Sequence, residues 1–255
     1  MQKKILYTVL SVVCFMFSGF AQLSPPGLGE TNTAFWQAVG VKQQLNDNNA
    51  LLVYAGLGRI SGPDSNNPIN NADIGVFNAE VYHKLSSHLK YSYALSYRRQ
   101  NHFDYTLADY AHSPSVTQEF RGYGRLAYTL KDAHAKYSLT LRQELREFYD
   151  ESFSAQSNEL QLRTRFKAGV TVPLDNHGNG LTGTAEALFS ISDEPNLGWD
   201  HFGYKESRFC LYYTYAPASA PVIFDIGYMN DLMGHGHELT DASYLAVDVV
   251  LVDLF

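Results

Sequence analysis

The sequence predicts an all-β protein, an antiparallel up-and-down transmembrane β-barrel of about 12 strands. Three observations support this fold class. Long segments alternate polar and apolar residues, short and long connections follow one another in turn, and an alternating apolar strand, Ser243 to Phe255, ends the chain. Together these features are typical of barrels in the outer membrane of Gram-negative bacteria, which is the location we expect.

Strand length separates this prediction from a soluble fold. The strands of a soluble, secreted β-protein also alternate, but they are usually about 5–6 residues long. A tilted strand that crosses a bilayer needs about 9–11 residues. Alternation here continues over longer segments, namely Glu119–Leu130, Ala135–Phe148, Asn158–Val172 and Ser243–Phe255. Length therefore favours the membrane barrel, and the soluble β-protein is kept as an alternative.

The connections between segments are of two kinds. Short periplasmic turns and longer extracellular loops are the expected asymmetry of an outer-membrane barrel. Short turns are predicted at Asn46–Asn49, Ser86–His88, Lys131–His134, Asp175–Gly180 and Ala216–Ala220, and longer loops at Ser61–Ala72, Asp104–Val116, Asp150–Ser157, Asp193–Phe202 and Asp231–Thr240.

The strand count is the difficult part of the prediction. About eleven segments are found, whereas bacterial single-chain barrels have even numbers of strands. The connection pattern makes the first strand, at Ala34–Leu45, run in the same direction as the last one. Either residues 22–33 supply part of another strand, which Pro25 and Pro26 disfavour, or one segment is divided wrongly. We expect 12 strands, with 10 as the alternative, in a barrel domain over residues 34–255.

The two ends of the chain carry targeting signals. Lys3 and Lys4 precede an apolar run that ends in small residues, which predicts a signal peptide over residues 1–21, cleaved after Ala21. Alternating apolar residues before Phe255 resemble the signal that the barrel-assembly machinery reads. We therefore expect that machinery and outer-membrane lipids as partners.

Composition excludes two classes of function. The formal net charge is −7, and it becomes −9 without the two lysines of the signal segment, which argues against nucleic acid as a partner. Beyond the signal segment there is no long apolar run, so a helical membrane protein is excluded. Cys210 is the one cysteine left after cleavage, which rules out an intrachain disulfide.

Several motifs resemble the domain-of-unknown-function 2490 family (DUF2490), small exported barrels of Gram-negative bacteria. They are an early strand with Phe35-Trp36 that ends in Lys42-Gln43-Gln44-Leu45, a middle strand that spans Arg142–Phe148, the arginine-rich segment Asn158–Arg165, and Leu211-Tyr212-Tyr213. The resemblance covers most of the mature chain through degenerate motifs. It implies a barrel and an outer-membrane location. It implies no activity and no functional residues.

Charged residues on one face of the central strands form the main candidate site. Arg or Lys facing lipid would cost about 2–4 kcal/mol at the bilayer midplane, so these residues are expected to point into the lumen. One interpretation is a structural ladder of ion pairs that fills a narrow barrel, and the other is a porin-like lining that selects small polar solutes. The predicted lumen-lining residues are Glu119, Arg121, Arg125, Arg142, Glu144, Arg146, Glu159, Arg163, Arg165, Lys167, Glu186, Glu206 and Arg208.

Other candidate chemistry is weaker. His235 and His237 lie in a long loop beside acidic residues, but two histidines do not define a metal site, so we predict no metal and no cofactor. Ser92 and Ser96 lie on a strand that could be near His83, His88 or His102, yet no nucleophile motif surrounds them. An outer-membrane lipid hydrolase is therefore an alternative, and enzyme activity is not expected.

Aromatic residues complete the prediction. Tyrosines near strand ends and on outward faces are read as the interfacial girdles of a membrane barrel. They are Tyr91, Tyr93, Tyr97, Tyr123, Tyr128, Tyr137, Tyr213 and Tyr215.

Overall fold

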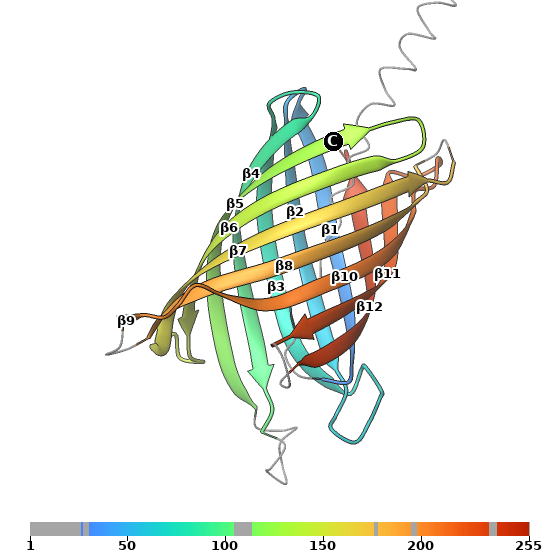
Figure 1. The fold of residues 1–255 in the computed structure, drawn as a ribbon. Helices are drawn as coiled ribbons and strands as arrows, with labels where there is room; N and C mark the ends of the chain where they lie inside the picture. The colour runs from blue at the N-terminus through green and yellow to red at the C-terminus, as the bar shows by residue number, and fades with distance from the viewer. Residues whose placement is uncertain are drawn as a thin grey trace, which may run out of the picture.

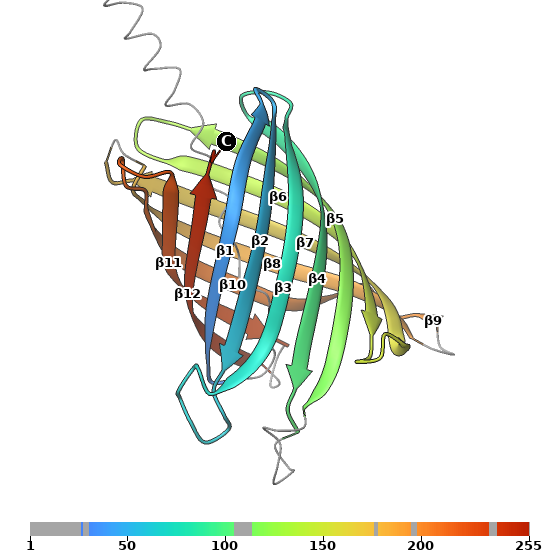
Figure 2. The same ribbon diagram turned by 180° about the vertical axis from the view of Figure 1, so that it is seen from behind.

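The protein is a closed β-barrel (Figures 1 and 2). The computed structural model describes residue 27 and residues 31–104, 114–175, 178–194, 198–234 and 239–254, without the side chains of residues 156–159 and 194. The predicted signal peptide, His235, His237 and Phe255 lie outside the described residues. Within them, no helix is long and apolar enough to span a membrane.

Eleven long strands form the wall and one short strand lies beside it. The wall strands are β1 (Thr33–Asn46), β2 (Asn49–Ile60), β3 (Asn71–Lys84), β4 (Leu89–His102), β5 (Ser115–Lys131), β6 (Lys136–Tyr149), β7 (Ala155–Pro173), β8 (Gly180–Glu194), β10 (Gly203–Tyr215), β11 (Val222–Met233) and β12 (Thr240–Val252). The short strand β9 (Gly198–Trp199) pairs only with the end of β8. The prediction of an all-β barrel of about 12 strands is confirmed.

The barrel closes through a parallel seam. All neighbouring wall strands pair antiparallel except β1 and β12, which pair in parallel from Thr33 with Ser243 to Lys42 with Val252. Figure 2 shows both arrows pointing the same way. An odd number of up-and-down strands necessarily brings a first and a last strand of equal direction together. The eleven segments found in the sequence were thus the eleven wall strands, and β1 itself begins at Thr33.

Asp253 finishes this seam. Its backbone N–H donates to the carbonyl oxygen of Lys42 at 2.9 Å, and its carboxylate accepts the backbone N–H of Gln44 at 2.7 Å. These two bonds continue the pairing with β1 one residue beyond the end of β12. Asp253, which interrupts the apolar alternation of the last strand, thus contributes hydrogen bonds at the end of the seam.

The connections divide the barrel into two ends. We call one the turn end, where the short connections 47–48, 85–88, 132–135, 174–179 and 216–221 lie, and the other the loop end. The turn at 132–135 shows how these connections are built. The Asp132 carboxylate accepts the backbone N–H groups of His134 and Ala135 at 2.7 and 2.8 Å. These bonds hold the pKa of Asp132 below its ordinary value.

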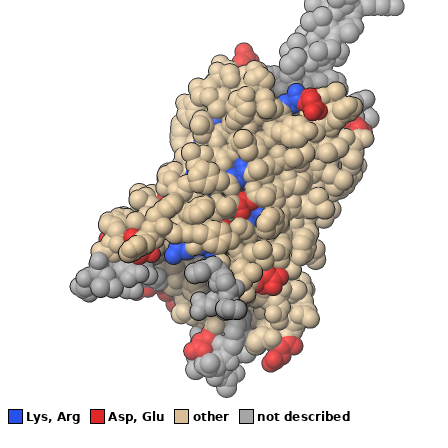
Figure 3. Space-filling model, in the orientation of Figure 1, with Lys and Arg blue, Asp and Glu red and all other residues tan. Residues whose placement is uncertain are grey.

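The wall has an apolar outside. Large exposed hydrophobic residues recur at every second position of the strands, for example Leu139, Leu141 and Leu145 on β6. Figure 3 shows this surface mostly without charge, with Lys, Arg, Asp and Glu chiefly near its two ends and a small group near the middle. A largely apolar hollow of about 500 Å³ lies over β5–β8 and β10, and the small residues Ala168, Ala185 and Ala187 are part of its lining.

Candidate functional site

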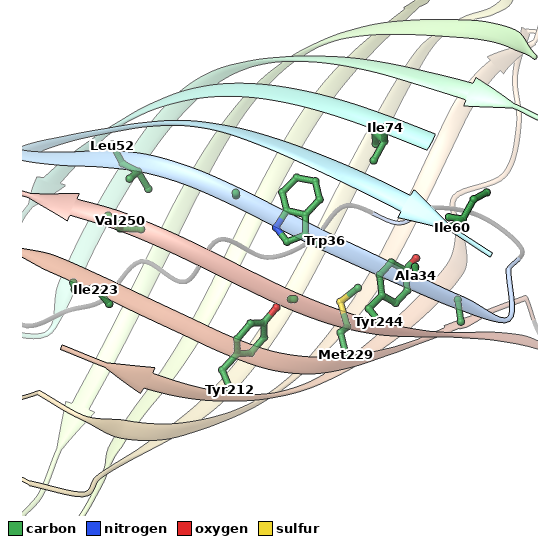
Figure 4. Packing of buried hydrophobic residues seen from close by; sticks show 13 residues of the cluster. Ala34, Trp36, Leu52, Ile60, Ile74, Tyr212, Ile223, Met229, Tyr244 and Val250 are labelled. Atoms are coloured by element: carbon green, nitrogen blue, oxygen red, sulfur yellow. The ribbon is translucent and has the colours of Figure 1, made fainter. Parts of the chain in front are cut away.

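The inside of the barrel is divided into an apolar half and a charged half. The apolar half lies on the strands around the seam, β1, β2, β3, β10, β11 and β12 (Figure 4). Its buried residues are Ala34, Trp36, Ala38, Leu52, Ile60, Ile74, Tyr212, Ile223, Met229, Ala242, Tyr244, Ala246 and Val250, which we call the apolar cluster.

Glycines make room for the aromatic rings of this cluster. A Cβ on Gly56 would lie 2.3 Å from the Trp36 ring, and a Cβ on Gly227 would lie 2.3 Å from the Tyr212 ring. The rings therefore lie flat against bare backbone of the neighbouring strand. The Trp36 Nε1–H donates to Oδ1 of the buried Asp248 at 3.0 Å, which fixes the indole in the lumen.

The charged half is a network of buried ion pairs on β5, β6, β7, β8, β10 and β11, which we call the charged belt. Its residues are Glu119, Arg121, Arg142, Glu144, Arg146, Arg163, Arg165, Glu186, Glu206, Arg208 and Asp231. Period-2 alternation turns every one of these side chains to the same face of the sheet.

The belt begins at Glu119, which is 2% exposed and binds two arginines. Its Oε1 accepts the Nε–H of Arg121 at 2.8 Å and that of Arg146 at 2.7 Å. The Arg146 Nη2 also donates to Oε2 at 2.7 Å, so this pair is bidentate. Such fork-shaped pairs fix geometry as well as charge.

Glu144 is the centre of the belt and is 0% exposed. Its Oε1 lies 2.7 Å from Nε of Arg142 and 2.6 Å from Nε of Arg165, while its Oε2 lies 3.5 Å from Nη1 of Arg121. One carboxylate therefore joins β5, β6 and β7. Burial of a carboxylate this deep carries a desolvation cost of several kcal/mol, which the attraction of the surrounding arginines offsets.

The belt continues to the edge of the apolar half. Nη1 of Arg165 lies 3.3 Å from Oε1 of Glu186, and that atom lies 3.8 Å from Nη1 of Arg208. Arg208 also pairs with Glu206 and lies 3.3 Å from Oδ2 of Asp231. Acids and bases thus alternate across the lumen from β5 to β11.

A second polar cluster lies beside the belt and was not predicted. The Glu80 carboxylate accepts the Tyr123 hydroxyl at 2.9 Å and the Ser92 hydroxyl at 2.5 Å, and it lies 3.3 Å from Nη2 of Arg125. The Arg142 guanidinium stacks over the Tyr123 ring at 3.4 Å. The alternation of Asn78, Glu80, Tyr82 and Lys84 on β3 was the signal that could have found Glu80.

The girdle prediction needs one correction. Tyr123 is buried in the lumen rather than placed on the outer wall, because it shares the inward face of β5 with Arg121 and Arg125. Its hydroxyl donates to Glu80, and the Arg142 guanidinium stacks over its ring. Other tyrosines of that prediction, including Tyr91, Tyr93 and Tyr213, are exposed.

The structure brings the predicted ladder residues whose side chains it describes together on the inner face. Arg121, Glu144 and Arg165 lie in the belt, and Arg125 lies on Glu80. Lys167 is opposite Glu186 in the β7–β8 register. The side chain of Glu159 lies outside the described residues. Arg98, Asp231 and Gly27 join the site without having been predicted.

The serines and histidines of the hydrolase alternative are not brought together among the described residues. The buried Ser92 hydroxyl points inward to Glu80, and the Ser96 hydroxyl donates to the carbonyl oxygen of Phe77 at 3.1 Å. The His83 ring stacks on Tyr91 and Tyr93, whose side chains are exposed, with ring centroids 4.5 and 5.4 Å away. Ser92 and His83 thus lie on opposite faces of the wall.

Two cavities enter the lumen from its two ends. One of about 290 Å³ opens at the turn end, and one of about 280 Å³ lies toward the loop end. Arg98 lines both cavities and is 9% exposed. Its Nη2 donates to the carbonyl oxygen of Gly27 at 2.8 Å. A Cβ on Gly27 would lie 2.6 Å from Nη2 of Arg208. Backbone from before β1 therefore lies between two arginines inside the barrel.

Comparisons with known proteins give a family but no activity. LpxR from Salmonella typhimurium is a similar solved structure, with 9% sequence identity, a TM-score of 0.44, and coverage of 80% of this chain and 83% of that chain. No curated protein matches the sequence. The family model described as "Protein of unknown function (DUF2490)" matches residues 33–238, which is most of the barrel. The chain therefore belongs to the DUF2490 family.

Proposed function

We propose that this protein is an outer-membrane barrel with a closed lumen, in which the charged belt is a structural plug rather than the lining of an open channel. The observation that carries the proposal is the continuous set of buried ion pairs from Glu119 through Glu144 to Asp231.

Barrel size supports a plug. Eight strands give an interior that side chains just fill, and porins with 16–18 strands leave an aqueous channel. Eleven wall strands lie near the lower limit. Large side chains from both halves fill the remaining width, among them Trp36, Tyr244, Arg165 and Arg208, and the Gly27–Arg98 contact lies between the two cavities.

The distribution of apolar side chains supports the outer-membrane location. Exposed large hydrophobic residues occur on every wall strand, and the residues of the charged belt point inward. Soluble proteins rarely expose contiguous apolar patches larger than a few hundred Å² to water. Larger apolar surfaces are typical of binding sites or of contact with a membrane. The turn end then faces the periplasm.

Cell fractionation tests the location. The protein should be recovered with outer membranes, require detergent for extraction, and migrate faster on a gel before boiling than after it. Extraction by salt or alkali alone would contradict the proposed location without bearing on the state of the lumen.

Liposome swelling tests the plug. Proteoliposomes that contain the purified barrel should swell no faster in an isotonic pentose solution than liposomes without protein. Swelling at the rate given by a porin of similar size would instead support the narrow-channel interpretation. A folded state verified by the heat-dependent gel shift is the control for both outcomes.

A further inference from the structure

The cavity at the turn end is lined by many more basic than acidic residues. Among its described lining residues, ten are basic and four are acidic, an excess of six positive charges in a chain of net charge −7. Some of the arginines belong to the charged belt and pair with Glu144 and Glu119, which do not line this cavity. The lysines supply much of the remaining excess.

These lysines come from separate strands and converge on one space. Seven lysines follow residue 21, and five of them line this cavity. They are Lys42 on β1, Lys84 on β3, Lys90 on β4, Lys136 on β6 and Lys167 on β7. Lys42, Lys90 and Lys136 are close enough to repel one another, and Asp253 offsets part of the charge at Lys42. Five of seven side chains in one cavity is far from an even distribution of lysine over the barrel.

The fold places these charges where lipid does not explain them. Lysines that anchor a barrel at the membrane interface extend outward or along the wall. Here the lysines occupy positions that line the cavity, and Lys136, for example, alternates with the outward residue Tyr137, which is exposed and does not line it. Repulsion between like charges costs stability. A bound polyanion would remove this cost.

Hydroxyl groups complete the lining. Tyr54, Ser138, Thr140 and Thr184 line the same cavity, and the hydroxyls of Thr171 and Thr182 are 3.0 Å apart on its wall. The volume of about 290 Å³ is close to the lower limit for small-molecule sites, for which about 300–1,000 Å³ is usual. Ammonium groups supply charge and hydroxyls supply directed hydrogen bonds, a combination suited to phosphate oxygens.

We propose that this cavity, which we call the lysine pocket, binds a small phosphate-bearing anion that enters from the turn end. A phosphate group carries a charge of about −1.5 to −2 at pH 7, so one or two such groups neutralise several lysines in a small volume. With the membrane orientation proposed above, the ligand enters from the periplasm. The proposal itself needs only the cavity and not the location or the plug.

Titration calorimetry on the detergent-solubilised full barrel tests the lysine pocket, with inorganic pyrophosphate as the probe. We expect saturable binding that weakens as salt rises, since salt screens exposed charges. The double variant Lys90→Gln/Lys136→Gln should bind about tenfold more weakly, from the loss of two nearby charges. Lys90→Arg/Lys136→Arg keeps the charges and should bind within about threefold of the wild type.

Lys205→Gln is the matched control, because Lys205 is exposed on β10 and does not line the pocket. It should leave binding unchanged.

A second arm uses soluble dihexanoyl phosphatidic acid. Binding of pyrophosphate supports a free solute, whereas binding of phosphatidic acid alone supports a lipid headgroup as the source of the phosphate. No saturable binding of either probe, or equal losses in the Lys205→Gln and the Lys90→Gln/Lys136→Gln variants, would overturn the proposal. The heat-dependent gel shift verifies that each variant is folded.

Discussion

The two halves of the lumen fill the same space by opposite means. Around the seam, the Trp36 and Tyr212 rings pack against glycines, and Tyr244 belongs to the same buried apolar cluster. Across the lumen, arginines and glutamates fill the space, and Glu144 is surrounded by three arginines. In apolar packing, the unfolding free energy falls gradually as contacts are lost. In an ion network, removal of one member leaves a buried charge without its partner, which costs more. The two halves should therefore respond differently to comparable substitutions.

The largest effect is expected for Glu144→Ala. This change leaves Arg142, Arg165 and Arg121 facing one another in a buried site. Breaking a buried pair in this way costs about 3–5 kcal/mol of unfolding free energy. Urea unfolding in detergent micelles, followed by the gel shift, measures it. Gln143→Ala on the outward side of the same strand is the control and should cost less than about 1 kcal/mol. Similar losses for the two variants would contradict the central place of Glu144.

A smaller effect is expected for Gly56→Ala in the apolar half. The added Cβ would lie 2.3 Å from the Trp36 ring, which cannot move away without breaking its bond to Asp248. Overpacking of this kind costs about 1–3 kcal/mol. Gly75→Ala is the matched control on the next strand, because its nearest neighbour is 3.8 Å away. The same unfolding assay should separate the two alanines, and an unaffected Gly56→Ala variant would show that the apolar half is loosely packed.

Ser92→Ala sharpens the comparison within the charged half. Removal of this hydroxyl leaves one oxygen of the buried Glu80 without its 2.5 Å donor. An unsatisfied buried acceptor costs about 1–3 kcal/mol, while Ser96→Ala, which loses only a bond to an accessible carbonyl, should cost less. Phospholipid turnover should be absent in the wild type as well as in both variants. Turnover that Ser92→Ala abolishes without loss of stability would return the hydrolase to consideration.

The smallest effect on stability is expected for the lysine pocket. Lys90 is exposed at the turn end, so Lys90→Gln should change the unfolding free energy by less than about 0.5 kcal/mol. The same variant contributes to the loss of pyrophosphate binding. If Lys90→Gln weakens pyrophosphate binding and leaves the unfolding free energy nearly unchanged, the charged belt stabilises the fold and the lysine pocket binds the ligand. A large loss of stability in Lys90→Gln would mean that Lys90 is part of the structural network.

Sequence patterns predicted the local features well. Alternation placed Arg121, Glu144 and Arg165 on one face because side chains of a strand point in turn to its two faces, a property of the backbone alone. The same rule places Tyr123 inward, whereas the residue type alone predicts an aromatic ring at the membrane interface. For residues in strands, position in the alternation was the better guide.

Features that depend on distant segments were not predictable in this way. The seam pairs Thr33 with Ser243, and nothing local in either strand distinguishes a parallel partner from an antiparallel one. The even-number rule was therefore preferred to the eleven segments that were counted. Contacts of Gly27 with Arg98 and of Glu80 with Tyr123 also join segments far apart in the chain, and alternation, which can place Glu80 on the inner face, does not identify the partner of its side chain.

Planar-bilayer conductance tests the closed lumen most directly. Wild-type barrel reconstituted at pH 7 should give no steady conductance above that of the bare bilayer, because the belt and the apolar cluster fill the lumen between the two cavities. The variant Arg165→Ala/Arg208→Ala, which removes two guanidinium groups from the belt, should produce open events if it remains folded by the gel shift. A steady open pore in the wild-type protein would contradict the account.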